Sequence, residues 1–143
     1  MSLLNVTELL GGKQFLGREL ENKMDFFEVG NRGLTKESVM HLANYLDLSQ
    51  HEIAKLLSIS IRTLQRYKTE QYINSVTSEH VLKLAETITK GVDVFGSKEK
   101  FVNWLQHPNL ALANKRPIYL LESQYGIDMV LDELIRIEYG VFS

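Results

Sequence analysis

Between Gln50 and Lys68 the sequence reads QHEIAKLLSISIRTLQRYK, and this stretch contains the signals for two short helices joined by a tight turn. Ser49 is placed to cap the first helix and Ser60 to cap the second, while Glu52 completes a capping box. Ala54 supplies the small residue needed where two helices cross steeply, and Ser58 stands at the turn, where glycine is commoner. We therefore predict a helix-turn-helix, with these side chains in its core: Ile53, Leu57, Ile59, Leu64 and Tyr67.

The second helix of this motif has polar side chains suited to DNA. A recognition helix enters the major groove and contacts base edges through its N-terminal residues. Arginine pairs bidentately with guanine and glutamine with adenine. We expect base contacts from Ser60, Arg62, Gln65 and Arg66, and phosphate contacts from Lys55, Tyr67 and Lys68. The residues alone leave open a second interpretation, in which the two helices belong to an ordinary bundle and the arginines are simply solvated.

Helix signals recur along the rest of the chain, and no segment alternates apolar and polar residues as strands do. Thr35, Thr77 and Ser97 are placed as N-caps, Gly96 as a helix end and Pro117 as the first residue of a short helix. The expected fold class is all-α, a compact helical protein.

The two ends of the chain carry less regular signals. Gly11, Gly12 and Gly17 interrupt any long helix in the first 30 residues, although apolar side chains there can pack: Leu9, Leu10, Phe15, Leu16, Leu20, Phe26, Phe27 and Val29. After Gly126 we expect a last helix that ends at Gly140 and leaves Asp128, Asp132 and Glu133 outside. Its apolar face comprises Ile127, Val130, Leu131, Leu134 and Ile137.

Composition and charge limit the class of protein. The chain has 143 residues, of which 44% are hydrophobic and 24% charged, as in ordinary globular proteins. It has no cysteine, which excludes disulfides, zinc–thiolate sites and a cysteine nucleophile. The N-terminus does not resemble a secretory signal, and no apolar run approaches the roughly 20 residues that cross a bilayer. We expect a cytoplasmic protein without a membrane partner.

Charge is distributed unevenly along the chain. Residues 50–68 contain four cationic side chains against one acid, a net charge of +3, whereas residues 119–143 contain five acids against Arg136, a net charge of −4. Such asymmetry can mark different partners for the two ends.

No motif for catalysis or metal binding stands out. Residues 91–98, GVDVFGSK, resemble a phosphate-binding loop, but serine precedes lysine and a helix precedes the first glycine. The four histidines are too far apart for a local ligand pair, and no GxSxG elbow occurs. We expect no catalytic residue, no metal and no cofactor, and therefore a protein that is not an enzyme.

Two parts of the chain resemble a known family. The segments LDLSQHEIAKLL (46–57) and ISIRTLQRYK (59–68) resemble the helix-turn-helix of Xre-like antitoxins. The segments VFGSKEKFVNWL (94–105), HPNLAL (107–112), RPI (116–118), YGI (125–127) and LIRIEYGVFS (134–143) are similar to the Xre/MbcA/ParS toxin-binding domain. The resemblance covers roughly residues 30–143.

This resemblance implies an antitoxin that neutralises a RES-type toxin, which consumes or uses NAD, and that represses its own operon by binding operator DNA. It also implies a homodimer. Because the RTLQR segment is common in the family, Arg62 and Arg66 would serve phosphate contact or packing, and Ser60, Ile61 and Gln65 would decide specificity. The toxin-binding residues would be Arg136, Glu138, Tyr139, Gly140, Val141, Phe142 and Ser143.

We divide the chain accordingly into an N-terminal segment without assigned role (1–29), a helix-turn-helix domain (30–92) and a toxin-binding domain (93–143). The main alternative is a helix-turn-helix transcription regulator whose C-terminal domain serves dimerisation or ligand sensing.

Overall fold

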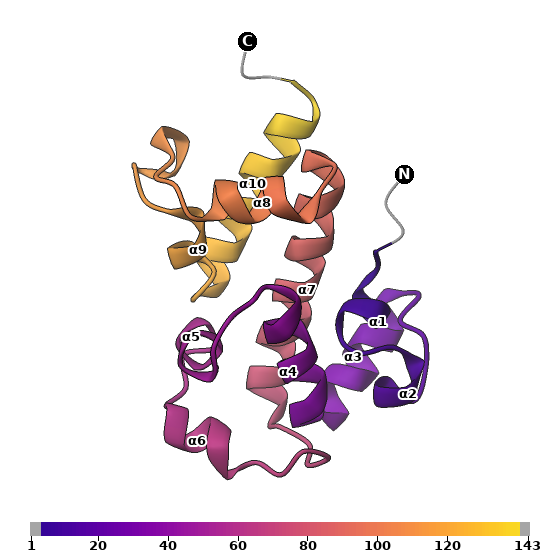
Figure 1. The fold of residues 1–143 in the computed structure, drawn as a ribbon. Coiled ribbons are helices and arrows are strands. Elements are labelled where there is room, and N and C mark those ends of the chain that lie inside the picture. The colour runs from indigo at the N-terminus through magenta and orange to yellow at the C-terminus, as the bar shows by residue number, and fades with distance from the viewer. Residues whose placement is uncertain (1–3, 141–143) are drawn as a thin grey trace.

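The computed structural model describes residues 4–140, which form helices joined by short turns (Figure 1). Within this range there is no strand, and β-pairing is limited to two isolated bridges, Thr35 with Tyr72 and Asn109 with Lys115. The predicted all-α fold is confirmed. In chain order the elements are α1 (Val6–Leu9), α2 (Lys13–Leu16), α3 (Lys23–Arg32), α4 (Lys36–Tyr45), α5 (Gln50–Leu56), α6 (Ile61–Arg66), α7 (Ser75–Phe95), α8 (Lys98–Leu105), the 3₁₀ turn η1 (Leu110–Leu112), α9 (Pro117–Leu120) and α10 (Gln124–Glu138).

Side-chain caps explain where most of these helices begin. The side-chain oxygens of Thr35, Ser49, Ser60 and Ser97 each accept the backbone N–H three residues later, as predicted. Each such bond satisfies one of the amides that a helix start leaves without a partner. Pro117 is the first residue of α9, also as predicted.

Two helix starts differ from the prediction. The cap of α7 is Asn74 rather than Thr77, because the Asn74 side chain accepts the Thr77 amide at 2.9 Å and the helix begins three residues earlier. Similarly, α10 begins before Gly126, because Ser123 Oγ accepts the Gly126 amide at 3.0 Å. In both cases the N-cap is a polar residue that lies earlier in the sequence than the predicted helix start.

Glycines end or separate helices where the sequence indicated. Gly96 terminates α7 with φ +80°, and Gly140 follows α10 with φ +67°, both in the left-handed region that glycine tolerates. Gly11, Gly12 and Gly17 limit α1 and α2 to four residues each.

Helix α7 is the centre of the structure, and α1, α3, α8 and α10 all pack on it. It buries Val81, Leu84, Ala85 and Ile88 along its length. It also continues past residue 92, where the sequence analysis places a domain boundary, so one helix contributes to both halves of the chain. None of the helices in residues 4–140 is both long and apolar enough to cross a membrane.

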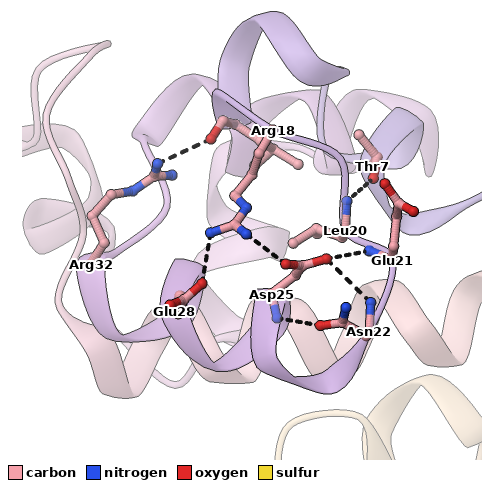
Figure 2. A network of polar contacts seen from close by, with 9 residues as sticks. Thr7, Arg18, Leu20, Glu21, Asn22, Asp25, Glu28 and Arg32 are labelled. Atoms are coloured by element: carbon pink, nitrogen blue, oxygen red, sulfur yellow. Dashed lines mark hydrogen bonds and ion pairs between the residues drawn. The ribbon is translucent and has the colours of Figure 1, made fainter.

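The N-terminal segment is attached to α3 by polar contacts, which Figure 2 shows. The Arg18 guanidinium contacts Asp25 at 2.6 Å and Glu28 at 2.9 Å, and Arg32 Nη1 donates to the Leu16 carbonyl at 3.0 Å. Beneath these contacts Leu9, Leu10, Leu16 and Val29 are buried as expected. Phe27 could also have packed, but its residue is 67% exposed because α3 turns its opposite side, with Asp25 and Val29, toward the rest of the structure.

Candidate functional site

The predicted helix-turn-helix is present as α5, a tight turn and α6. Ala54 is buried at the crossing, and Ser58 adopts the left-handed backbone conformation (φ +56°) that the turn requires. The expected core is largely confirmed, since Ile53, Leu57 and Leu64 are buried, whereas Ile59 and Tyr67 are half-buried.

One side of α6 presents polar and cationic side chains to solvent. Arg62, Gln65 and Arg66 are exposed together on this short helix, and Lys55 and Lys68 are exposed on the segments beside it. None of these four cations forms an ion pair with any residue in 4–140. Their charges are therefore available to phosphates, which dominate protein–DNA affinity.

The side chains of two other candidate DNA-contacting residues, Ser60 and Ile61, already have contacts within the protein. Ser60 Oγ caps the Thr63 amide at 3.0 Å and also donates to Thr63 Oγ1 at 2.8 Å, so its main task is to start α6. Ile61 is half-buried against the core. The geometry therefore favours Arg62, Gln65 and Arg66 as the side chains that project outward.

Gln50 is a residue that the sequence analysis missed. Its Oε1 accepts a hydrogen bond from Gln65 Nε2 at 3.3 Å, which joins the first residue of α5 to the exposed side of α6. Nearby, the Glu52 carboxylate accepts the Ser49 amide at 2.9 Å, and this hydrogen bond lowers the pKa of Glu52. The side chains are fifteen positions apart, so no local pattern could have indicated the Gln50–Gln65 contact.

The turn of the motif contacts the C-terminal part of the chain directly. Ser58 Oγ donates to the Glu122 carbonyl at 3.0 Å, and the buried His80 of α7 reaches the Leu121 carbonyl at 2.9 Å. Both acceptors lie in the short connection between α9 and α10. The two halves therefore pack as one body around this connection.

The polar residues predicted to bind the toxin lie near the end of α10. Arg136 pairs with Glu133 at 2.8 Å, and Glu138 pairs with Lys90 of α7 at 2.7 Å. Glu133 is only 13% exposed, so it is more enclosed than the sequence indicated. Tyr139 is 74% exposed. Val141, Phe142 and Ser143 lie outside the described residues.

The outward side of α10 also presents large apolar side chains that the sequence analysis did not select. Tyr125 is 87% exposed, and Met129 and Ile135 are each more than two-fifths exposed. With 3.6 residues per turn, all three fall on the same side as Tyr139, opposite the buried Val130. The i, i+4 spacing of Tyr125 and Met129 could have indicated this patch. Exposed apolar patches of this kind mark protein interaction sites.

Leu110 of η1 adds a further exposed side chain to the C-terminal half, at 87% exposure. Element η1 packs against α10, so Leu110 lies on the same half of the molecule as the α10 patch. By contrast, no cluster of three or more potential metal ligands occurs within residues 4–140.

The chain matches two family models, each over a range that contains one of these two surfaces. The antitoxin Xre-like helix-turn-helix domain matches residues 28–86, which include α5 and α6. The antitoxin Xre/MbcA/ParS C-terminal toxin-binding domain matches residues 90–140, which include η1 and α10.

Curated relatives agree with these matches. A protein named antitoxin Xre from Yersinia enterocolitica is 28% identical over 113 residues, which span 78% of this chain and 76% of the relative. Another antitoxin Xre, from Photorhabdus laumondii, is 25% identical over 115 residues, which span 79% of this chain and 78% of the relative.

Proposed function

Since this chain belongs to the Xre family of antitoxins, with a helix-turn-helix and a C-terminal toxin-binding domain, we propose that it neutralises a RES-type toxin and represses its own operon. The observation that supports this dual role best is the separation of two exposed surfaces with opposite chemistry. The surface on α6 is cationic, and the surface on α10 combines apolar side chains with acids. In Figure 1, α6 and the end of α10 lie at opposite ends of the molecule.

DNA binding uses the exposed side of α6. Arg62, Gln65 and Arg66 enter the major groove, while Lys55 and Lys68 contact phosphates. Ser60 and Ile61 complete the sequence-predicted set, Ser60 by fixing the start of α6 and Ile61 by packing beneath it. A homodimer presents two such helices to the two halves of an operator.

Toxin binding uses the outward side of α10 and the chain end. Tyr125 and Met129 provide apolar contact, and aromatic anchors of this type contribute most of the energy at protein interfaces. Arg136 and Glu138 are exposed or half-exposed ion-pair members, and such surface pairs are weak enough to be exchanged for partner contacts. Tyr139 and Gly140 continue from this surface, and together with Val141, Phe142 and Ser143 they bind the toxin and occlude its active-site cleft.

The mode of action is binding alone, in the cytoplasm, without a catalytic step, a metal or a cofactor. The toxin consumes NAD or transfers part of it, and the antitoxin prevents this by covering the cleft.

The experiment combines the full chain with the product of the adjacent gene and measures NAD loss with and without the chain. We expect a stable complex that suppresses NAD loss. The variant Tyr125→Lys/Met129→Lys should lose protection but keep operator binding, and Arg62→Ala/Arg66→Ala should show the reverse. Deletion of residues 141–143 should weaken protection and leave operator binding intact.

Two outcomes would contradict the proposal. Absence of both a complex and protection would favour a transcription regulator whose C-terminal domain dimerises it or senses a ligand. Loss of both activities in each double variant, with folding intact by circular dichroism, would show that the two surfaces are not separate.

A further inference from the structure

A groove on the surface lies between α3 and α7, away from both surfaces described above. This groove has a volume of about 510 Å³, and Phe26, Phe27 and Leu82 provide its apolar lining. Neither α6 nor α10 contributes to it. In Figure 1, α3 lies on the side of α7 that faces away from α5, α6 and α9.

Helix α3 exposes two large apolar side chains, one in the wall of the groove and one next to a lining residue in the sequence. Phe27 is 67% exposed and Met24, one turn earlier on α3, is 61% exposed. Phe27 is therefore a largely exposed ring in the wall of the groove, and it projects beside the part that Phe26 and Leu82 line. A projection beside a hollow on one surface is self-complementary, because a two-fold axis places each projection in the hollow of the other copy.

The charges of the groove are also self-complementary. Glu79, Lys83 and Glu86 line it from α7, and none of them forms an ion pair with a residue in 4–140. Glu79 and Lys83 are four residues apart and so occupy one side of the helix. When two copies of α7 run antiparallel about an axis between these positions, Glu79 of each copy faces Lys83 of the other. Two reciprocal ion pairs result.

Other occupants fit the groove less well. Glu21, Glu79 and Glu86 outnumber Lys23 and Lys83 on its rim, so its net charge opposes binding of nucleic acid. The toxin-binding domain matched at residues 90–140 does not include the groove.

We propose that the α3–α7 groove is the surface through which two copies of this chain associate, with Phe27 of each copy inserted beside Leu82 of the other. The proposed function includes a homodimer, and this inference says where its interface lies. It rests on the proposed function only for the role of the dimer in binding DNA. Because the groove is remote from α6 and α10, the dimer leaves both other surfaces free.

The test measures the mass of the full chain by analytical ultracentrifugation over a concentration series. We expect a dimer for the natural sequence, and Phe27→Lys should raise the dissociation constant by about 30-fold or more, as loss of an aromatic hot spot does. Tyr125→Lys is the matched control, because it places the same charge on a similarly exposed ring of α10 and should leave the dimer intact. Both variants should keep the circular dichroism of the parent chain, because both side chains are largely exposed.

Charge reversal tests the antiparallel arrangement separately. Glu79→Lys and Lys83→Glu should each weaken the dimer, because each single change creates two like-charge contacts. The double variant E79K/K83E should restore it, since the reciprocal pairs are then re-formed with exchanged signs. A monomer at every concentration, or a dimer that Phe27→Lys does not weaken, would overturn the inference.

The readouts keep this inference distinct from the proposed function. Phe27→Lys should still suppress NAD loss by the toxin, and it should lose affinity for a two-site operator while binding a single half-site as the parent chain does. Failure of the toxin assay with the parent chain would contradict the proposed function and leave the mass measurement unaffected.

Discussion

The imidazole Nε2 of His80 lies 2.9 Å from the carbonyl oxygen of Leu121, so a buried side chain of α7 donates a hydrogen bond to the connection between α9 and α10. Because a carbonyl oxygen only accepts, Nε2 must carry the proton. Helix α10 then runs beside α7 in the same direction and is joined to it again at its far end, where Glu138 pairs with Lys90. The His80–Leu121 contact and the Lys90–Glu138 pair therefore join both ends of α10 to α7.

Replacing His80 with alanine should lower the free energy of unfolding by about 1–3 kcal/mol, because the Leu121 carbonyl loses its buried donor. Urea denaturation followed by circular dichroism measures this change. His107→Ala is the control, since His107 is exposed and its ring bonds the carbonyl of Asn103 in α8, the helix that ends just before it. Equal losses in the two variants would contradict the structural role of His80.

Gly126→Ala should be more severe, at about 3 kcal/mol or more. A Cβ at this position would lie 1.8 Å from the Leu120 carbonyl oxygen, so the backbone connection before α10 would have to move. At Gly30 the nearest atom to an added Cβ is the flexible Leu82 Cδ1, at 3.2 Å. Thermal unfolding should therefore show a much smaller loss for Gly30→Ala, and a similar loss at both positions would argue against the clash.

Stability should fall in acid partly through Asp25. Its carboxylate accepts the Glu21 amide and contacts Arg18, and these interactions lower its pKa below the usual value of 3.8. A lowered pKa stabilises the folded state above the unfolded-state value, and this contribution is lost as the pH falls through the folded-state value. The melting temperature of Asp25→Asn should therefore lie below that of the parent chain at neutral pH, and the difference should shrink below about pH 4. A constant difference down to pH 2 would contradict this assignment.

Gln65 and Lys68 should contribute differently to DNA binding. Gln65→Ala should relax discrimination at one operator position by about 1–3 kcal/mol, because a bidentate base contact is lost. Lys68→Ala should instead weaken binding to every sequence and reduce the salt slope by about one. Binding titrations against a set of single-base operator variants at two salt concentrations separate the two effects. If both variants lost the same affinity for every operator sequence, Gln65 would not contact a base.

Features that depend on neighbouring residues could be predicted from the sequence alone. The caps at Thr35, Ser49, Ser60 and Ser97 each involve an amide three residues away, so a local pattern contains both partners. The local pattern did not show which of several nearby polar residues would be the N-cap. Asn74 and Ser123 accept the capping amides, so α7 and α10 begin before Thr77 and Gly126.

Only the tertiary structure decided which distant groups meet. His80 and Leu121 are 41 positions apart, and Ser58 and Glu122 are 64 apart, so no periodicity contains both partners of either bond. The same holds for the exposure of Phe27, which depends on how α3 turns against α7 rather than on its own pattern. Capping hydrogen bonds and helix periodicity involve residues only three or four positions apart. The sequence therefore determined the helices and the helix-turn-helix. The free surfaces are what remains after the core has packed, and packing is a property of the whole chain.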